Sequence, residues 1–446
     1  MEADNYLAGG YGTRIAIEAK AGGWQKFSAV ASTWQPSRLK GIQVSPEYGT
    51  PFLAATQVYD VRPIPRKWLS FDRTENVEGR FVKAGTILLT CSGDVGRATL
   101  AHSTIDGILI SHDLLRIEAH DAEWAGWIYA YLRAPTVRAI LKSAQYGHII
   151  KHLEVSHINA LPIINIGSTS RKSFTVAANA ILEKRNDSHR LTLEAERLFE
   201  ESFGSFSAND FGEQGFVSRA SSAFRNRRRL DAWHYNPSVN ATERHLNSSA
   251  VAWQSIETLG FKVWLPTRFR RIPAEDGIPL VESASLFELS PDISKSIADG
   301  KFGDPFEGRV KAGWILLARS GQIYGVNGNA MLPGTFCEGK IISDDVIRIA
   351  PHRPLCPVGY LATTLTHPTL GRPRVKALPY GSSIPHIEVA DVQTFMIPRL
   401  SEAEEGRIAE AAENAARLRS EADEMESALA EEAELEIARF FSERVS

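Results

Sequence analysis

The chain has 446 residues, of which 43% are hydrophobic and 23% charged, an ordinary composition for a soluble globular protein. Its length predicts two domains plus connectors. No apolar run is long enough to span a bilayer, no basic stretch followed by an apolar segment opens the chain, and the three cysteines lack CxxC spacing. We therefore expect no membrane span, secretory signal, disulfide framework or zinc site, and a reducing, cytoplasmic location.

The net charge of −3 is unevenly distributed along the chain. Residues 401–444 contain 14 acidic and 5 basic side chains, a net of −9, so the remainder carries +6. A mildly basic globular part is compatible with a polyanionic partner.

In the first half, short apolar runs predict buried strands at 81–90 and 108–117, and a helix is expected at 124–141. A long helix should run from about Ser170 to Phe203, ending at Gly204 before a linker. Its apolar seam is Phe174, Ala177, Ile181, Leu191, Ala195 and Leu198, with Lys184 and Ser188 in the middle.

The second half repeats this order. Strands are expected at 314–318 and 341–349 and a helix at 359–370. Ser401 and Glu404 then form a capping box for a second long helix. Its seam is Ile408, Ala411, Ala415, Leu418, Ala422, Met425 and Leu429, continuing through Ala433, Ile437 and Phe440. The two seams predict an antiparallel pair; an external partner or a homodimer is the alternative.

The two halves share motifs in one order, at a nearly constant offset along the chain. KAGTILL at 83–89 matches KAGWILL at 311–317, and both precede Ser-Gly. ISHDLLRI at 110–117 matches ISDDVIRI at 342–349. Tyr-Gly and then HLEV at 152–155 match Tyr-Gly and HIEV at 386–389. This period is far longer than that of solenoid repeats, so each copy should be a whole domain.

Two loops per copy are candidate DNA-reading elements. The glycine-rich loops at 92–97 and 320–325 lack the lysine and threonine or serine of a phosphate-binding loop. They predict either tight hairpins or loops that face DNA, since arginine and glutamine match base edges. The Tyr-Gly loops are the second pair. The candidate side chains are Arg97, Tyr146, His148 and Lys151 in the first copy, and Gln322, Tyr324, Tyr380, Ser382 and Ser383 in the second.

Basic clusters are the candidates for phosphate contacts. The densest lie at 224–229 and 268–271, and basic runs are otherwise ordinary solvated faces. The candidate residues are Arg227, Arg228, Arg268, Arg270 and Arg271, with Arg38 and Lys40 at the matching positions of the first copy.

Catalytic and metal-binding patterns are absent from the sequence. It contains no HExxH, GxSxG or P-loop, and no tetrapeptide typical of adenine methyltransferases. Asp113 and Asp345 lack the Glu-x-Lys partner of a nuclease, so a turn or salt-bridge role is expected. His148, His152 and His157 lack further convergent ligands, so we expect hydrogen bonding rather than a metal site. His152 and Glu154, with their counterparts in the second copy, could equally be internal scaffold partners.

In these duplicated blocks the chain resembles the specificity (S) subunits of type I restriction–modification systems. Arg229 to Pro237 also resembles the usual opening of a target recognition domain. The resemblance implies an α+β fold with two similar target recognition domains, at 1–167 and 205–400, separated by two long antiparallel coiled-coil helices, at 168–204 and 401–446.

The resemblance also implies a function. Each domain would read one half of a split DNA site, the helices would fix the gap, and the differing loops would make the site asymmetric. The chain would have no catalysis or cofactor of its own. Its partners would be double-stranded DNA, two methyltransferase (M) subunits that use S-adenosylmethionine to methylate adenines, and motor-nuclease (R) subunits, in phage defence. The alternatives are a DNA-processing nuclease with a duplicated fold and a coiled-coil scaffold that binds no DNA.

Overall fold

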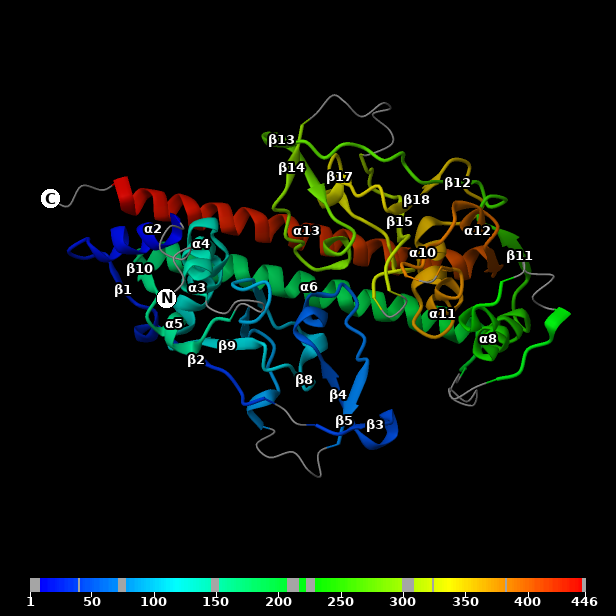
Figure 1. The fold of residues 1–446 in the computed structure, drawn as a ribbon, viewed down its shortest axis with the longest axis horizontal. Helices are drawn as coiled ribbons and strands as arrows, with labels where there is room; N and C mark the ends of the chain where they lie inside the picture. Colours follow the sequence, from blue (N-terminus) through cyan, green and yellow to red (C-terminus); the bar gives the residue numbers. More distant parts are fainter. Residues whose placement is uncertain are drawn as a thin grey trace. The chain divides into compact units, whose positions relative to one another are not determined.

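A computed structural model describes most of the chain, which divides into two compact units (Figure 1). The described residues are 9–38, 41–70, 78–145, 152–206, 216–221, 229–298, 309–322, 325–381 and 383–442. The first unit comprises residues 1–186 and 422–446, and the second comprises residues 187–421. Each unit holds a globular α+β domain, called here the first and the second domain, together with part of both long helices.

The described residues of the first domain form three sheets. A two-stranded antiparallel sheet joins β1 (Trp24–Lys26) to β10 (Pro162–Ile164). A four-stranded antiparallel sheet has the order β2 (Ala31–Trp34), β9 (Leu114–Ala119), β6 (Ile87–Thr90), β7 (Ala98–Leu100). The third sheet has the order β3 (Gln43–Val44), β5 (Lys67–Leu69), β4 (Thr50–Leu53), β8 (Leu109–Ile110), with β4 and β8 parallel.

The second domain repeats this arrangement of three sheets. Its two-stranded sheet is β11 (Ala252–Ser255) with β19 (Met396–Arg399). Its four-stranded sheet has the order β12 (Phe261–Trp264), β18 (Val346–Pro351), β15 (Ile315–Ala318), β16 (Ala330–Met331). Its third sheet has the order β14 (Ser296–Ile297), β13 (Pro273–Val281), β17 (Ile341–Ile342), with β13 and β17 parallel.

Strand register confirms that the two domains are copies of one fold. Ile87 and Leu88 pair with Ile117 and Arg116 in the first domain. In the second, Ile315 and Leu316 pair with Ile349 and Arg348. Since the side chains of a strand alternate between its two faces, equal register places equivalent residues on equivalent faces.

Two strand predictions were wrong in the same way. The segments 108–117 and 341–349 are each two strands, which lie in different sheets. Ser111 separates β8 from β9, and its hydroxyl donates to Asp113 at 2.8 Å. In the second copy the Asp345 amide donates to the Ser343 hydroxyl at 3.3 Å. This local side-chain bonding forms a turn, which interrupts each predicted strand.

The short helices also recur. A helix precedes the first strand of each domain, α2 (Gly9–Glu18) and α8 (Pro237–Asn247). The predicted helix at 124–141 is two helices, α3 (Ala122–Arg133) and α4 (Pro135–Ala144), because Pro135 cannot donate to the preceding turn and starts a new helix. Their counterparts are α10 (Val358–Thr366) and α11 (Arg372–Lys376). α5 (Val155–Asn159) and α12 (Val389–Gln393) precede the last strands.

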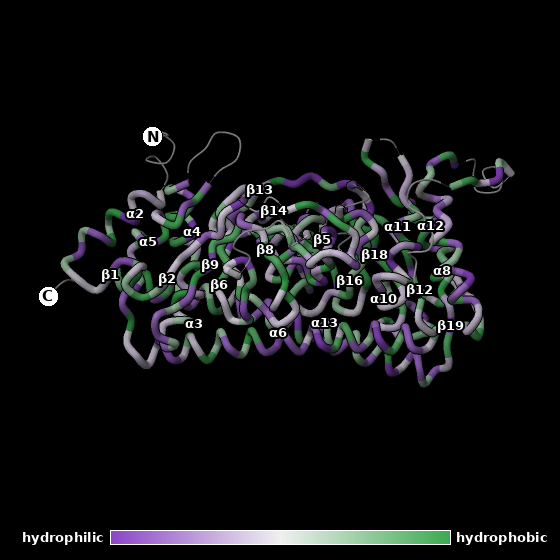
Figure 2. Tube along the Cα trace, turned by 90° about the horizontal axis from the view of Figure 1, so that it is seen from below, coloured by the Kyte–Doolittle hydropathy of each residue, from purple (hydrophilic) through white to green (hydrophobic). Residues whose placement is uncertain are grey.

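The two long helices are α6 (Ser168–Phe203) and α13 (Glu402–Ser442). Within each unit their segments run antiparallel and pack together (Figure 1). Hydrophobic residues alternate with hydrophilic ones along both helices (Figure 2), and the buried ones join the core of the domain in the same unit. None of the described helices is both long and apolar enough to cross a membrane.

A glycine lets each domain approach a long helix closely. A Cβ on Gly126 of α3 would lie 2.3 Å from the backbone of Thr175 in α6. A Cβ on Gly359 of α10 would lie 2.5 Å from the carbonyl oxygen of Ala409 in α13. Both distances are too short for any side chain, so glycine fixes these two contacts.

A buried ionic cluster lies between the long helices in the first unit. The Arg185 guanidinium of α6 contacts Asp423 at 2.5 Å and Glu426 at 2.7 Å on α13. The Tyr129 hydroxyl of α3 donates to Glu426. Burial by itself raises the pKa of Glu426, but Arg185 and Arg133 outweigh it and lower that pKa to about 2. The seam pattern placed Lys184 here, whereas the structure buries Arg185 instead.

Candidate nucleic-acid interface

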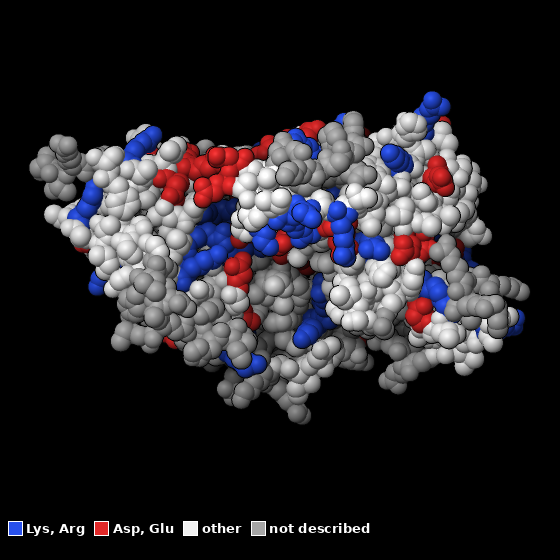
Figure 3. Space-filling model, turned by 45° about the horizontal axis from the view of Figure 1, so that its top comes forward, with Lys and Arg blue, Asp and Glu red and all other residues white. Residues whose placement is uncertain are grey.

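Basic side chains gather in patches on the face seen in Figure 3, while acidic side chains gather near its upper edge. Arg38, Arg268 and Arg270 are exposed. The third arginine of the 268–271 cluster, Arg271, donates to Asp344 at 2.7 Å and to Ser343 at 3.3 Å. Each of these arginines follows β2 or β12, the strands that end in Trp34 and Trp264.

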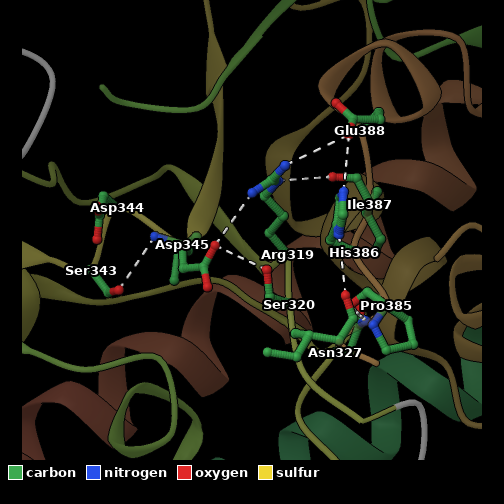
Figure 4. A network of polar contacts seen from close by, with 12 residues as sticks. Arg319, Ser320, Asn327, Ser343, Asp344, Asp345, Pro385, His386, Ile387 and Glu388 are labelled. Atoms are coloured by element: carbon green, nitrogen blue, oxygen red, sulfur yellow. Dashed lines mark hydrogen bonds and ion pairs between the residues drawn. The ribbon is translucent and has the colours of Figure 1, made fainter. Parts of the chain in front are cut away.

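In the second domain the three duplicated motifs converge at one place (Figure 4). Ser320, which follows β15, pairs with His386 in an antiparallel bridge. The Arg319 amide donates to the Asp345 carbonyl at 3.1 Å, and the Ile387 amide donates to the Arg319 carbonyl at 3.0 Å. The Ser-Gly loop, the Ser-x-Asp turn and the His-x-Glu segment are therefore joined through their backbones.

The first domain has the same backbone framework. Ser92 pairs with His152, the counterpart of the Ser320 bridge. The Cys91 amide donates to the Asp113 carbonyl at 3.0 Å, and the Leu153 amide donates to the Cys91 carbonyl at 2.9 Å. Motifs that are well separated in the sequence thus meet in one site in each copy.

A fully buried arginine supports each Ser-x-Asp turn. Arg116 donates to the carbonyls of Ser111 and Ile110, both at 2.9 Å. Arg348 donates to the carbonyls of Ser343 at 2.9 Å and Ile342 at 2.6 Å. Burial lowers the pKa of Arg116 to about 10 and that of Arg348 to about 9, so both remain charged near neutral pH.

Side chains reinforce the framework in the second domain (Figure 4). Arg319 lies 3.5 Å from Asp345 and 3.6 Å from Glu388, and Glu388 lies 3.4 Å from His386. The Ser320 hydroxyl donates to Asp345 at 2.9 Å. These groups are part-exposed, so each pair alone contributes little stability, but together they fix the segment that follows Tyr380.

The first domain differs at the centre of the site, where Cys91 replaces Arg319. Ser92 and His152 make a side-chain hydrogen bond of 3.1 Å. A cavity of about 430 Å³ opens here, and its lining includes Gln35, Cys91, His152, Glu154 and Ser156. Burial, with a contribution from Asp113, raises the pKa of the Cys91 thiol to about 12, so the thiol is neutral.

An equivalent lysine lies beside the glycine-rich loop in each copy. Lys142 of α4 lies 3.9 Å from Asp94. Lys376 of α11 donates to the carbonyls of Gly325 at 3.1 Å and Asn327 at 2.8 Å. Gly93 and Gly96 have positive φ, as the hairpin interpretation of this loop requires.

Arg97, a predicted base-reading side chain, lies beside its own domain. Its guanidinium stacks on the Tyr59 ring at 3.9 Å, and the Tyr59 hydroxyl donates to the Arg97 carbonyl at 2.8 Å. The side chain is half-buried. Tyr59 therefore orients this arginine.

Tyr380 is oriented in a similar way. Its backbone exchanges two hydrogen bonds with His386, and its ring lies 5.7 Å from the His386 ring. Arg229 lies 5.3 Å from the Tyr380 ring and donates to the carbonyls of Leu378 and Pro379, both at 2.7 Å. Gln322 and Ser383 are exposed nearby in the chain.

Half of the predicted site residues fall outside the part of the chain that the structure describes. They are Lys40, Tyr146, His148, Lys151, Arg227, Arg228, Tyr324 and Ser382.

The predictions missed the divergence between Cys91 and Arg319, the supporting roles of Arg116 and Arg348, and the hydrogen bonds from Lys376 to its loop. Alignment of the two copies would reveal the first of these, because Arg319 and Cys91 each directly precede the duplicated Ser-Gly pair. Among the described residues, no three His, Cys, Asp or Glu side chains converge closely enough to hold a metal ion.

Comparison with known proteins gives matches among solved structures only. No family model and no curated protein matches the chain. The S subunit of a type I restriction–modification system from M. genitalium is 12% identical over 94% of both chains, with a TM-score of 0.29. The HsdS subunit from Thermoanaerobacter tengcongensis is 13% identical over 94% of this chain and 97% of that one, with a TM-score of 0.28. The type IIG restriction endonuclease BpuSI matches 39% of this chain and 28% of its own, at 11% identity and a TM-score of 0.30.

Proposed function

We propose that this chain is a DNA sequence-specificity subunit, which reads a bipartite, asymmetric site and directs adenine methyltransferase subunits, and any associated restriction subunits, to it. The observation that carries the proposal is that both domains bring the same three motifs into one site. A duplicated binding framework suits a target made of two parts.

Charge supports DNA as the target. The chain outside the acidic segment 401–444 carries +6. Exposed arginines, Arg38 in the first domain and Arg268 and Arg270 in the second, follow equivalent strands. They would contact phosphates, which position a protein on DNA, and binding should weaken steeply with salt.

Differences between the copies support an asymmetric target. Cys91 and His112 of the first domain correspond to Arg319 and Asp344 of the second. These exchanges alter the hydrogen-bonding groups in the site while the backbone framework stays the same. Base edges are distinguished by their donors and acceptors, so the two domains should prefer different half-sites.

The duplicated motifs support a non-catalytic role. Asp113 accepts a hydrogen bond from Ser111 within the turn, and Asp345 contacts Arg319 and Ser320. Such engagement favours a structural role over metal-dependent cleavage. Chemistry would then come from partner subunits, with S-adenosylmethionine bound by the methyltransferase, and the long helices would set the gap between half-sites.

The test is to co-express the chain with the methyltransferase encoded beside it and to map methylated adenines in host DNA by long-read sequencing. We expect one split, asymmetric motif that disappears when the chain is removed. Exchange of the first domain for that of another such subunit should change one half-site only.

Three outcomes would contradict the proposal. Absence of new methylation, with the partner active and bound, would favour the scaffold alternative. Metal-dependent cleavage of DNA by the purified chain would favour the nuclease. A domain exchange that altered both half-sites would refute modular reading.

A further inference from the structure

The cavity in the first domain occupies the place that an arginine fills in the second. Cys91 and Arg319 are equivalent, since each makes the same two backbone hydrogen bonds to the Ser-x-Asp turn and the His-x-Glu segment. In the second domain the Arg319 guanidinium extends to Asp345 and Glu388 and donates to the Ile387 carbonyl at 3.3 Å. The shorter Cys91 side chain leaves this space open in the first domain.

Two further differences make the wall of the cavity polar. Gln35 stands where the second domain has Leu265, as the residue after the equivalent tryptophan. Ser156 stands where the second domain has Ala390. The two domains therefore differ at all three positions. Gln35 and Ser156 are both exposed, so they add polar groups at the open side of the cavity that the second domain lacks.

The wall mainly offers hydrogen-bond acceptors. The Gln35 amide nitrogen donates to the His112 carbonyl at 2.9 Å, which leaves its amide oxygen as an acceptor. The Ser156 hydroxyl donates to the Glu154 carboxylate at 3.3 Å, and Glu154 is exposed at the rim. A carboxylate accepts only, so the complementary ligand is a donor, as the guanidinium is in the second domain.

We propose that this cavity, here called the Cys91 pocket, reads the exocyclic amino group of a cytosine or adenine in the first half-site, with Glu154 as acceptor. The inference rests on the proposed function and names a specificity-determining residue for it. A base is favoured over a partner side chain because the pocket adjoins Ser92 and the glycine-rich loop. Glutamate accepting from an exocyclic amino group is a known mode of base recognition. In the second domain Arg319 fills this place, so the second half-site is read without an acceptor here.

Two variants test the pocket from opposite directions. Glu154→Gln removes the charge of the acceptor, and Cys91→Arg fills the pocket with the side chain that the second domain has. The matched control is Asp106→Asn, which removes one exposed carboxylate from the same domain, away from the site. Affinity is measured by fluorescence anisotropy on the intact complex with its methyltransferase, using the duplex identified by methylation mapping.

We expect each pocket variant to weaken binding to the cognate duplex about tenfold or more, while Asp106→Asn stays within about twofold. Duplexes in which single first-half-site bases lack their exocyclic amino group should identify one position. Loss of that amino group should weaken duplex binding by the wild type about tenfold and leave duplex binding by Glu154→Gln nearly unchanged. Substitutions in the second half-site should affect both proteins equally.

Failure of this inference can be distinguished from failure of the proposed function. If the complex methylates a split motif but both pocket variants keep wild-type affinity, the pocket does not read a base. If Cys91→Arg instead releases the methyltransferase while Glu154→Gln keeps wild-type response to every analogue, the pocket takes a partner side chain and the inference is wrong. Absence of any motif would refute the specificity function itself.

Discussion

Arg116 and Arg348 occupy equivalent positions of the two domains and donate the same set of hydrogen bonds. Each guanidinium is fully buried and donates to carbonyls in the turn that precedes its own strand. Each turn carries the chain from one sheet of its domain to another and ends at the candidate interface. These two arginines therefore couple the core of each domain to its site.

We expect Arg116→Met to destabilise the first unit by about 3 kcal/mol, because it leaves several buried carbonyls without donors. Arg348→Met should do the same in the second unit. Urea unfolding of the full chain measures both effects. Arg66→Met, at an exposed position, is the control and should change stability by less than about 1 kcal/mol. If Arg116→Met and Arg348→Met both cost as little stability as Arg66→Met, the two buried arginines do not support their turns.

Arg185→Leu should be among the most destabilising single changes in the first unit, at about 3–5 kcal/mol, because it leaves Asp423 and Glu426 buried without their cation. Adding Asp423→Asn and Glu426→Gln should recover part of this loss. The exposed pair of Arg190 and Asp187 gives the control, since Arg190→Leu should cost less than about 0.5 kcal/mol. Thermal unfolding monitored by circular dichroism distinguishes these cases. Equal losses from Arg185→Leu and Arg190→Leu would show that the buried cluster does not stabilise the unit.

Stability should fall with acidification because of His102. Burial, aided by Arg185, lowers the pKa of His102 to about 4, against an ordinary value of 6.5. Between pH 4 and 6.5 the unfolded chain binds more protons at His102 than the folded chain does. The stabilising contribution of neutral His102 is therefore complete above pH 6.5 and is lost as the pH falls toward 4. The loss amounts to up to about 3 kcal/mol. His102→Gln should flatten this dependence across that pH interval. The free energy of unfolding is measured with urea at each pH for the wild type and for His102→Gln. If both proteins show the same pH dependence, His102 is not its cause.

Gly126→Ala and Gly359→Ala should each destabilise their unit by about 2 kcal/mol or more, because the added methyl group collides with the backbone of a long helix. Gly406, which lies in α13 with open space around it, provides the opposite case. Gly406→Ala should stabilise the chain by up to about 1 kcal/mol through helix propensity. The melting temperature should fall for Gly126→Ala and Gly359→Ala and rise for Gly406→Ala. Tolerance of alanine at both close contacts would show that the domains and helices can separate locally.

Sequence alone determined the repeating plan of this protein. Duplicated blocks with a constant order predicted two similar domains, and the alternating spacing of apolar side chains predicted both long helices. Such signals are readable because they arise from local periodicity and from comparison of one copy with the other. The α+β class and the two long helices are confirmed.

Tertiary structure alone decided how the motifs act together. Ser92 meets His152, and Cys91 meets Asp113, through backbone pairing that no local pattern encodes. Burial of Arg185 instead of Lys184 followed from the position of two carboxylates on the other long helix. The Cys91 pocket is open because Cys91 is shorter than its counterpart Arg319, and residues from separate segments, Gln35 and Ser156 among them, line it. Contacts of this kind depend on packing between distant parts of the chain, and so they became visible only in the fold.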